Sequence, residues 1–100
     1  MKEVGHVEGL FDGNAEVDNP DGMGPYLEKV EETVTNHGGR YLVRMGEIHY
    51  SEDDPNSIAV ILEFPDAEAA MAWKNSPEYQ EILPHRLDNS HGPVLIVDGL

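Results

Sequence analysis

The chain has no cysteine and only one tryptophan, and it has six lysines and arginines against twenty aspartates and glutamates. The absence of cysteine excludes a disulfide framework, a thiolate metal site and a cysteine nucleophile. No apolar run approaches the roughly twenty residues of a membrane-spanning helix. The first ten residues carry acidic side chains and no continuous apolar stretch, unlike a signal peptide, so we expect a cytoplasmic location.

The shortage of basic residues leaves a formal net charge of -14 at pH 7. Nucleic acid is therefore not expected as a partner, because phosphate binding needs a basic face. A membrane surface with anionic lipids is disfavoured for the same reason. An acidic excess also occurs in proteins that stay soluble in concentrated salt, where self-repulsion is screened, so a halophile habitat is a hypothesis.

The 100 residues form one expected domain, 1–100, because no repeat, low-complexity tract or linker divides the chain. A domain of this size buries only about two-thirds of its unfolded surface, and a second subunit could bury more. The hydrophobic content of 39% is sufficient for one layered core, which argues against disorder.

The spacing of apolar residues and the positions of turn-forming residues predict the order strand, helix, strand, strand, helix, strand. We expect strands at about 3–11, 40–50, 57–64 and 93–100, an acidic loop at 12–24, a helix from Pro25 to about His37, and helical segments at 66–75 and 76–83. Gly38 or Gly39 can take the left-handed conformation that ends a helix. Asp66 and Ser76 can cap the two later segments, and Pro84 kinks or closes the second.

A βαββαβ order in which both helices can cover one face implies an α+β protein with an antiparallel, ferredoxin-like sheet. Side chains two residues apart on a strand share a face. Strict alternation therefore places Leu42 and Ile61 on the face that the helices leave open, beside several charges. This mixture suits a cavity better than open solvent. The charged residues expected on this face are His6, Glu8, Arg44 and Glu63.

Four segments, HGGRYLVRMGE, VILEFPDAEAAMAW, NSPEYQEILPHR and the closing VLIVDG, resemble the small bacterial and archaeal family known as domain of unknown function 1330. The resemblance covers about Pro25 to Gly99. It implies a ferredoxin-like fold whose exposed sheet face pairs with a second copy, so that a homodimer forms a dimeric α/β barrel. Related barrels include small monooxygenases, lactone isomerases and polyketide cyclases, but kinship of fold transfers no reaction.

Arg44 in YLVR and Glu63 in LEFP are positions that the resemblance carries over. One hypothesis is a catalytic pair, in which the arginine binds a carboxylate or enolate and the glutamate moves a proton. The alternative is a structural ion pair between neighbouring strands. His6 is the acid–base candidate, because an imidazole titrates near neutral pH, and its alternative role is a hydrogen bond inside a half-buried strand.

Four further side chains, together with Glu8, are candidates for substrate binding. Trp73 and Tyr79 can line a pocket, although aromatic residues on a helix more often belong to the core. His85 and Arg86 can lie at the cavity mouth, or they can offset the dipole at the end of a helix. The five histidines lack a paired spacing such as H-E-x-x-H, so no metal site is expected.

Two classes of function follow. The first is a cofactor-free enzyme that performs isomerase, cyclase or monooxygenase-like chemistry on a small molecule in the barrel cavity, with His6 or Glu63 as acid–base and Arg44 holding the developing anion. The second is a non-catalytic dimer that binds a small ligand or serves as a subunit of a larger assembly. Substituting the cavity charges would abolish turnover in the first class and change only affinity or assembly in the second.

Overall fold

A computed structural model describes residues 7–100 of the chain. Its elements are β1 (Gly9–Val17), the 3-10 helix η1 (Pro20–Met23), α1 (Gly24–Asn36), β2 (Arg40–Gly46), β3 (Ile58–Phe64), α2 (Ala67–Lys74), α3 (Pro77–Asn89), β4 (Ser90–His91) and β5 (Val94–Asp98). Within the described residues, no helix is long and apolar enough to cross a membrane.

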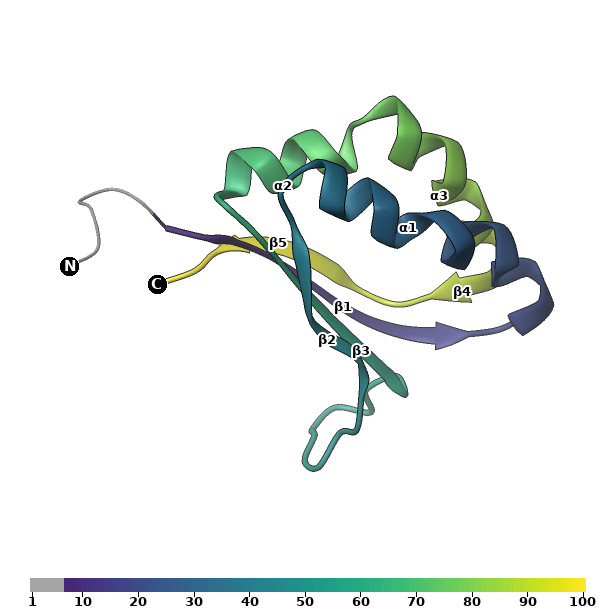
Figure 1. Cartoon of the computed structure of the whole chain (residues 1–100). Coiled ribbons are helices and arrows are strands. Elements are labelled where there is room, and N and C mark those ends of the chain that lie inside the picture. Colours follow the sequence, from purple (N-terminus) through teal and green to yellow (C-terminus); the bar gives the residue numbers. More distant parts are fainter. Residues whose placement is uncertain (1–6) are drawn as a thin grey trace.

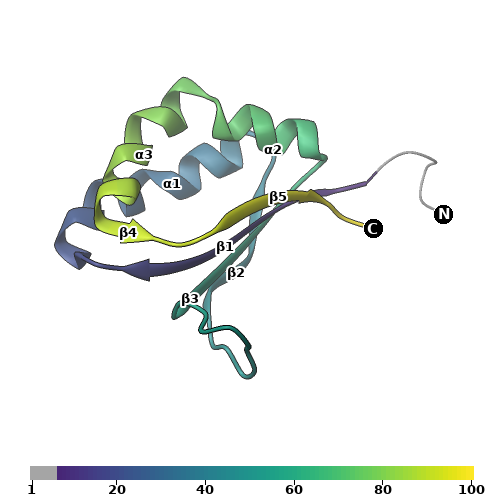
Figure 2. The ribbon, with the colours of Figure 1, turned by 180° about the vertical axis from the view of Figure 1, so that it is seen from behind.

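The sheet has one face packed against the helices, here called the covered face, and an opposite open face. The strands lie in the order β2, β3, β1, and the other edge of β1 pairs with β5 and with the short β4, all antiparallel. Figures 1 and 2 show α1, α2 and α3 on the same side of the sheet, while the β2–β3 connection projects away from the body. The predicted ferredoxin-like α+β fold is confirmed.

The first strand differs most from its expected position at 3–11. β1 begins at Gly9 and continues to Val17, so much of the expected acidic loop is strand. Residues 3–6 of the expected strand lie outside the described residues. Antiparallel pairing with β3 holds the segment as far as Ala15. Residues with low strand propensity form this strand because pairing and packing outweigh the local preference.

The helix boundaries follow signals that are present in the sequence. α1 ends before His37, and Gly38 takes a left-handed φ of 77°. The Asp66 carboxylate accepts a hydrogen bond from the Ala69 N–H at 2.7 Å, and the Ser76 hydroxyl caps α3 in the same way. The predicted caps of α2 and α3 are therefore confirmed.

Two boundaries and one short strand differ from the prediction. α3 continues through Pro84, which is exposed, so the helix tolerates the loss of one N–H donor there instead of ending. β2 stops at Gly46 and not at Tyr50, directly after Met45, whose φ is 50°. The sequence does not predict β4, because the two residues Ser90–His91 are too few to show a period.

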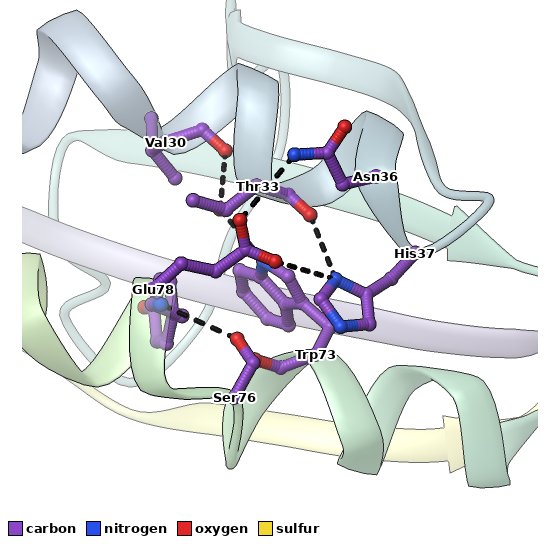
Figure 3. A network of polar contacts seen from close by, with 8 residues as sticks. Val30, Thr33, Asn36, His37, Trp73, Ser76 and Glu78 are labelled. Atoms are coloured by element: carbon purple, nitrogen blue, oxygen red, sulfur yellow. Dashed lines mark hydrogen bonds and ion pairs between the residues drawn. The ribbon is translucent and has the colours of Figure 1, made fainter.

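Trp73 is the centre of the core, and none of its surface is exposed. Its ring centre lies 5.3 Å from that of Phe64 on β3 and 4.2 Å from that of Tyr79 on α3. The indole N–H donates to the Thr33 hydroxyl at 3.0 Å, and this hydroxyl donates to the Val30 carbonyl at 2.7 Å (Figure 3). One side chain on α2 thus joins the sheet to both other helices.

Replacing Thr33 by valine keeps the shape of the side chain and removes the acceptor for the Trp73 N–H. A buried donor without a partner costs about 1–3 kcal/mol, so we expect Thr33→Val to lower the free energy of unfolding by that amount. Urea unfolding followed by the fluorescence of the single tryptophan measures the change. Thr35→Val is the control, since Thr35 is exposed on the same helix. An equal effect of both substitutions would contradict the role of this hydrogen bond.

Candidate functional site

β2 contains irregularities that change which face its side chains occupy. The pairing with β3 shifts between Tyr41 and Val43, which leaves Leu42 without a partner, and it shifts again between Arg44 and Gly46. An extra residue in one strand turns the following side chains to the other face. Tyr41 and Arg44, which strict alternation would separate, therefore both lie on the covered face.

The two arginines of β2 form separate ion pairs on opposite faces. Arg40 Nε lies 2.9 Å from Glu63 Oε1, whereas Arg44 Nη2 lies 3.0 Å from Glu31 Oε1 on α1. The Arg44 guanidinium carbon also lies 4.0 Å from the centre of the Tyr41 ring. The prediction that Arg44 and Glu63 share the open face is wrong, because the extra residue in β2 turns Arg44 to the covered face.

A cavity of about 520 Å³ lies between the covered face and the helices η1, α1 and α3. Its floor is β1 and β3, where the small residues Gly13 and Ala15 leave space. The larger apolar side chains of the lining are Phe11, Val17, Met23, Leu27, Val30, Met45, Ile58, Val60, Leu62 and Val94. The lining also includes the polar or charged residues Tyr26, Tyr41, Arg44, Arg86 and Ser90. A ligand in this cavity would mainly contact apolar atoms.

Two phenols of the lining are held in their neutral form. The Tyr26 hydroxyl lies 2.9 Å from the Tyr79 hydroxyl. Burial raises the pKa of Tyr26, and the neighbouring Tyr79 raises it further. Burial also raises the pKa of Tyr41, although the nearby Arg44 acts in the opposite direction. At neutral pH these side chains can donate hydrogen bonds but do not act as bases.

Arg86 lies in the last turn of α3 and lines the cavity. Its guanidinium carbon is 5.9 Å from the centre of the Tyr26 ring, and its Nε–H is buried with no hydrogen-bond acceptor among the described residues. Within residues 7–100, no carboxylate forms an ion pair with it. The Ser90 hydroxyl donates a 2.6 Å hydrogen bond to the Arg86 carbonyl, so Ser90 pairs only with the backbone of Arg86.

The cavity contains two of the predicted site residues, Arg44 and Arg86. Trp73 and Tyr79 lie in the core instead, with 0% and 1% of their surfaces exposed. The polar atoms of both are already bonded inside the fold, to Thr33 and to the Tyr26 hydroxyl. His85 is exposed on α3 and is not part of the lining.

The three other candidates do not meet at the cavity. Glu63 is bound to Arg40 on the open face. Glu8 precedes β1, where its carbonyl accepts the Gly99 N–H at 2.7 Å, and it is not part of the lining. His6 lies outside the described residues. Among residues 7–100, no group of three or more histidine, aspartate or glutamate side chains is arranged to hold a metal ion.

Tyr26 and Tyr41 belong to the site, but the patterns in the sequence did not single them out. For α1, the predicted buried side included Leu27, which is 59% exposed. The spacing of Tyr26, Val30 and Val34, four residues apart, marks the buried side instead, and it is readable from the sequence. For Tyr41, strict alternation gave the correct face, opposite Arg40 and Leu42, because Tyr41 precedes the extra residue of β2.

The fold and the cavity define a class of protein, the ferredoxin-like α+β domains with a pocket between sheet and helices. The chain belongs to the family described as "Domain of unknown function (DUF1330)", whose profile matches residues 10–100. The resemblance noted from the sequence motifs is therefore confirmed. No curated protein matches the chain.

Solved structures at low sequence identity share the fold. Methylated RPA0582 protein, from Rhodopseudomonas palustris, has a TM-score of 0.62 at 17% identity, covering 95% of this chain and 82% of its own. A putative antibiotic biosynthesis monooxygenase from Nitrosomonas europaea has a TM-score of 0.53 at 17% identity, covering 100% and 96%. A nipsnap family protein of unknown function from Agrobacterium tumefaciens has a TM-score of 0.50 at 19% identity, covering 98% and 94%. These likenesses show the fold alone.

One end of the cavity is lined by Ser90 of β4, and an exposed ion pair holds this short strand. Its neighbour His91 has Nδ1 2.9 Å from Asp18 Oδ2, just beyond the end of β1. The hydrogen bond to Asp18, and then the charge of Asp18, raise the pKa of His91. Protonated His91 therefore favours the folded state.

His91→Gln should lower the free energy of unfolding more at about pH 5.5 than at about pH 8.5. The reason is that a raised pKa gives stability that is fully present below the unfolded value of about 6.5 and is lost as pH rises through the folded value. Urea unfolding at both pH values measures this difference. His49→Gln, in the exposed β2–β3 connection, is the control. A pH-independent effect of His91→Gln would exclude this contribution.

Proposed function

We propose that this protein binds a small, mostly apolar molecule in the cavity beneath its helices, and that it does so as a cytoplasmic homodimer. The cavity carries the proposal, because its volume of about 520 Å³ lies within the roughly 300–1,000 Å³ of small-molecule sites. Its composition also fits, since such sites combine an apolar lining with a few polar groups that orient the ligand.

Catalysis is the second candidate. A cofactor-free acid–base enzyme needs a base within reach of the ligand. The described lining has no histidine, aspartate or glutamate, and its phenols stay protonated. Arg44 and Arg86 favour turnover, because both could stabilise a developing anion. The protein from Nitrosomonas europaea is named a putative monooxygenase, which supports catalysis only by analogy of fold. Isomerase, cyclase or monooxygenase-like activity therefore ranks behind binding.

Filling the cavity tests the proposed binding. Ala15 lines the floor, so a phenylalanine there would occupy the space that a ligand needs. We expect Ala15→Phe to weaken binding of N-phenyl-1-naphthylamine, a neutral dye that fluoresces in apolar sites, by about tenfold or more. Ala72→Phe adds the same ring at an exposed position of α2 and should leave the affinity unchanged. If Ala15→Phe binds the dye as well as the control does, this cavity is not the site.

The open face of the sheet supports the homodimer. Leu95 and Val97 on β5 are 57% and 43% exposed. Val97 lies opposite Leu10, and Leu95 and Ile61 lie on either side of Asp12, so these apolar side chains share one face. Exposed apolar side chains gathered on one face of a sheet are typical of an interaction site. A second copy is the expected occupant, because the family resemblance implies pairing through this face.

Placing a charge on the open face tests the dimer. We expect Val97→Lys to raise the dissociation constant of the dimer by at least about tenfold, because it replaces apolar contact area in the interface by a charge that must lose its hydration. Native mass spectrometry over a dilution series measures the constant. Met71→Lys is the matched control, since Met71 is also 43% exposed but lies on α2. A monomer in the unsubstituted protein, or equal dimerisation of both variants, would exclude this interface.

A further inference from the structure

The three arginines of the chain differ in what their charges meet. Arg40 is bound to Glu63 at 2.9 Å, and Arg44 is bound to Glu31 at 3.0 Å. Arg86 has no such partner within residues 7–100, although the chain has twenty acidic residues. One positive charge beside the cavity is therefore not neutralised by the described part of the protein.

The placement of Arg86 differs from that of a cation that only offsets a helix dipole. Such a side chain can extend into water and keep its hydration. The Arg86 guanidinium lies near the Tyr26 ring, and its Nε–H is buried with no acceptor in the part of the chain that the structure describes. Partial burial of an unpaired guanidinium is unfavourable. An anion in the cavity would offset this cost.

Tyr26, whose ring centre lies 5.9 Å from the Arg86 guanidinium carbon, carries a second hydrogen-bond donor. The hydroxyls of Tyr26 and Tyr79 are joined by one hydrogen bond of 2.9 Å and have no other partner among the described residues. Two hydroxyls carry two hydrogens, and the bond between them uses one. When Tyr79 donates to Tyr26, the Tyr26 hydrogen has no acceptor among the described residues, and the Tyr26 ring lines the cavity.

Building on the proposed binding function, we propose that the ligand is an organic monocarboxylate with an apolar body. Its carboxylate accepts hydrogen bonds from the Arg86 guanidinium and the Tyr26 hydroxyl, and its body lies on the apolar floor of β1 and β3. One unpaired guanidinium matches one negative charge, since Arg44 is already neutralised by Glu31. A ligand with more negative charge would gain less binding free energy, because the protein's net charge of -14 repels it.

The test compares 1-naphthylacetate with 2-(1-naphthyl)ethanol, which share an apolar body and differ in the charge of the head group. Each compound displaces N-phenyl-1-naphthylamine from the protein, and the displacement curves give two dissociation constants. We expect the carboxylate to bind about tenfold or more tightly than the alcohol, because hydrogen bonds to charged groups are the stronger ones.

Substitution of the arginines shows where this preference arises. Arg86→Gln should remove most of it while changing the affinity for the alcohol by less than about twofold. Arg40→Gln makes the same change in net charge on the open face and should keep the preference. Arg86→Lys retains the positive charge but lacks the planar guanidinium group, so it should keep part of the preference for the carboxylate. Thermal unfolding of each variant checks that it is folded. If Arg86→Gln is not folded, the test uses Arg86→Lys instead.

The possible results distinguish an error in the ligand class from an error in the proposed binding function on which it rests. If the unsubstituted protein binds both compounds equally, the monocarboxylate assignment is wrong while the pocket stands, because the dye is still displaced. A preference that survives Arg86→Gln, or that disappears in Arg44→Gln instead, overturns the role of Arg86. If the dye and both compounds all fail to bind, the proposed function is wrong, and this inference falls with it.

Discussion

The burial of Trp73 is the interaction on which the rest of the structure depends. Its ring packs on Phe64 of the sheet, and its indole N–H is bonded to Thr33 of α1. This packing joins the helices to one end of the covered face. The other end has no ring of that size on its floor, because β1 contributes Gly13 and Ala15 there. Large side chains at one end hold the helices above the sheet, and small ones at the other leave the cavity.

The extra residue in β2 decides the electrostatics around this cavity. By turning the strand, it leaves Arg40 with Glu63 on the open face and brings Arg44 to Glu31 on α1. Both pairs are largely exposed and contribute little to stability, so their effect is to neutralise two of the few positive charges. Arg86 is the arginine that the described residues leave unpaired, and its charge therefore defines the polar character of the cavity.

The candidate site was only partly predictable from the sequence. Arg44 and Arg86 line a cavity, but it lies on the covered face and not on the open face where alternation had placed a cavity with Arg44. The partner assigned to Arg44 was wrong, because alternation holds only for a strand without an extra residue. Tyr26 was readable from its spacing with the buried residues of α1, and alternation gave the correct face for Tyr41 but not for Arg44. Small inward-facing residues give no signal for a cavity, since an empty volume depends on all the side chains around it.

The sequence by itself determined the fold class, the order of the main helices and strands, and most helix boundaries. These follow from local preferences: periodic apolar residues, a glycine such as Gly38 that can take a positive φ, and the caps Asp66 and Ser76. Only the tertiary structure decided that β1 extends to Val17, which face Arg44 occupies and where the cavity lies. Each of these depends on pairing between strands far apart in the chain, and on the volumes of side chains that meet only after folding.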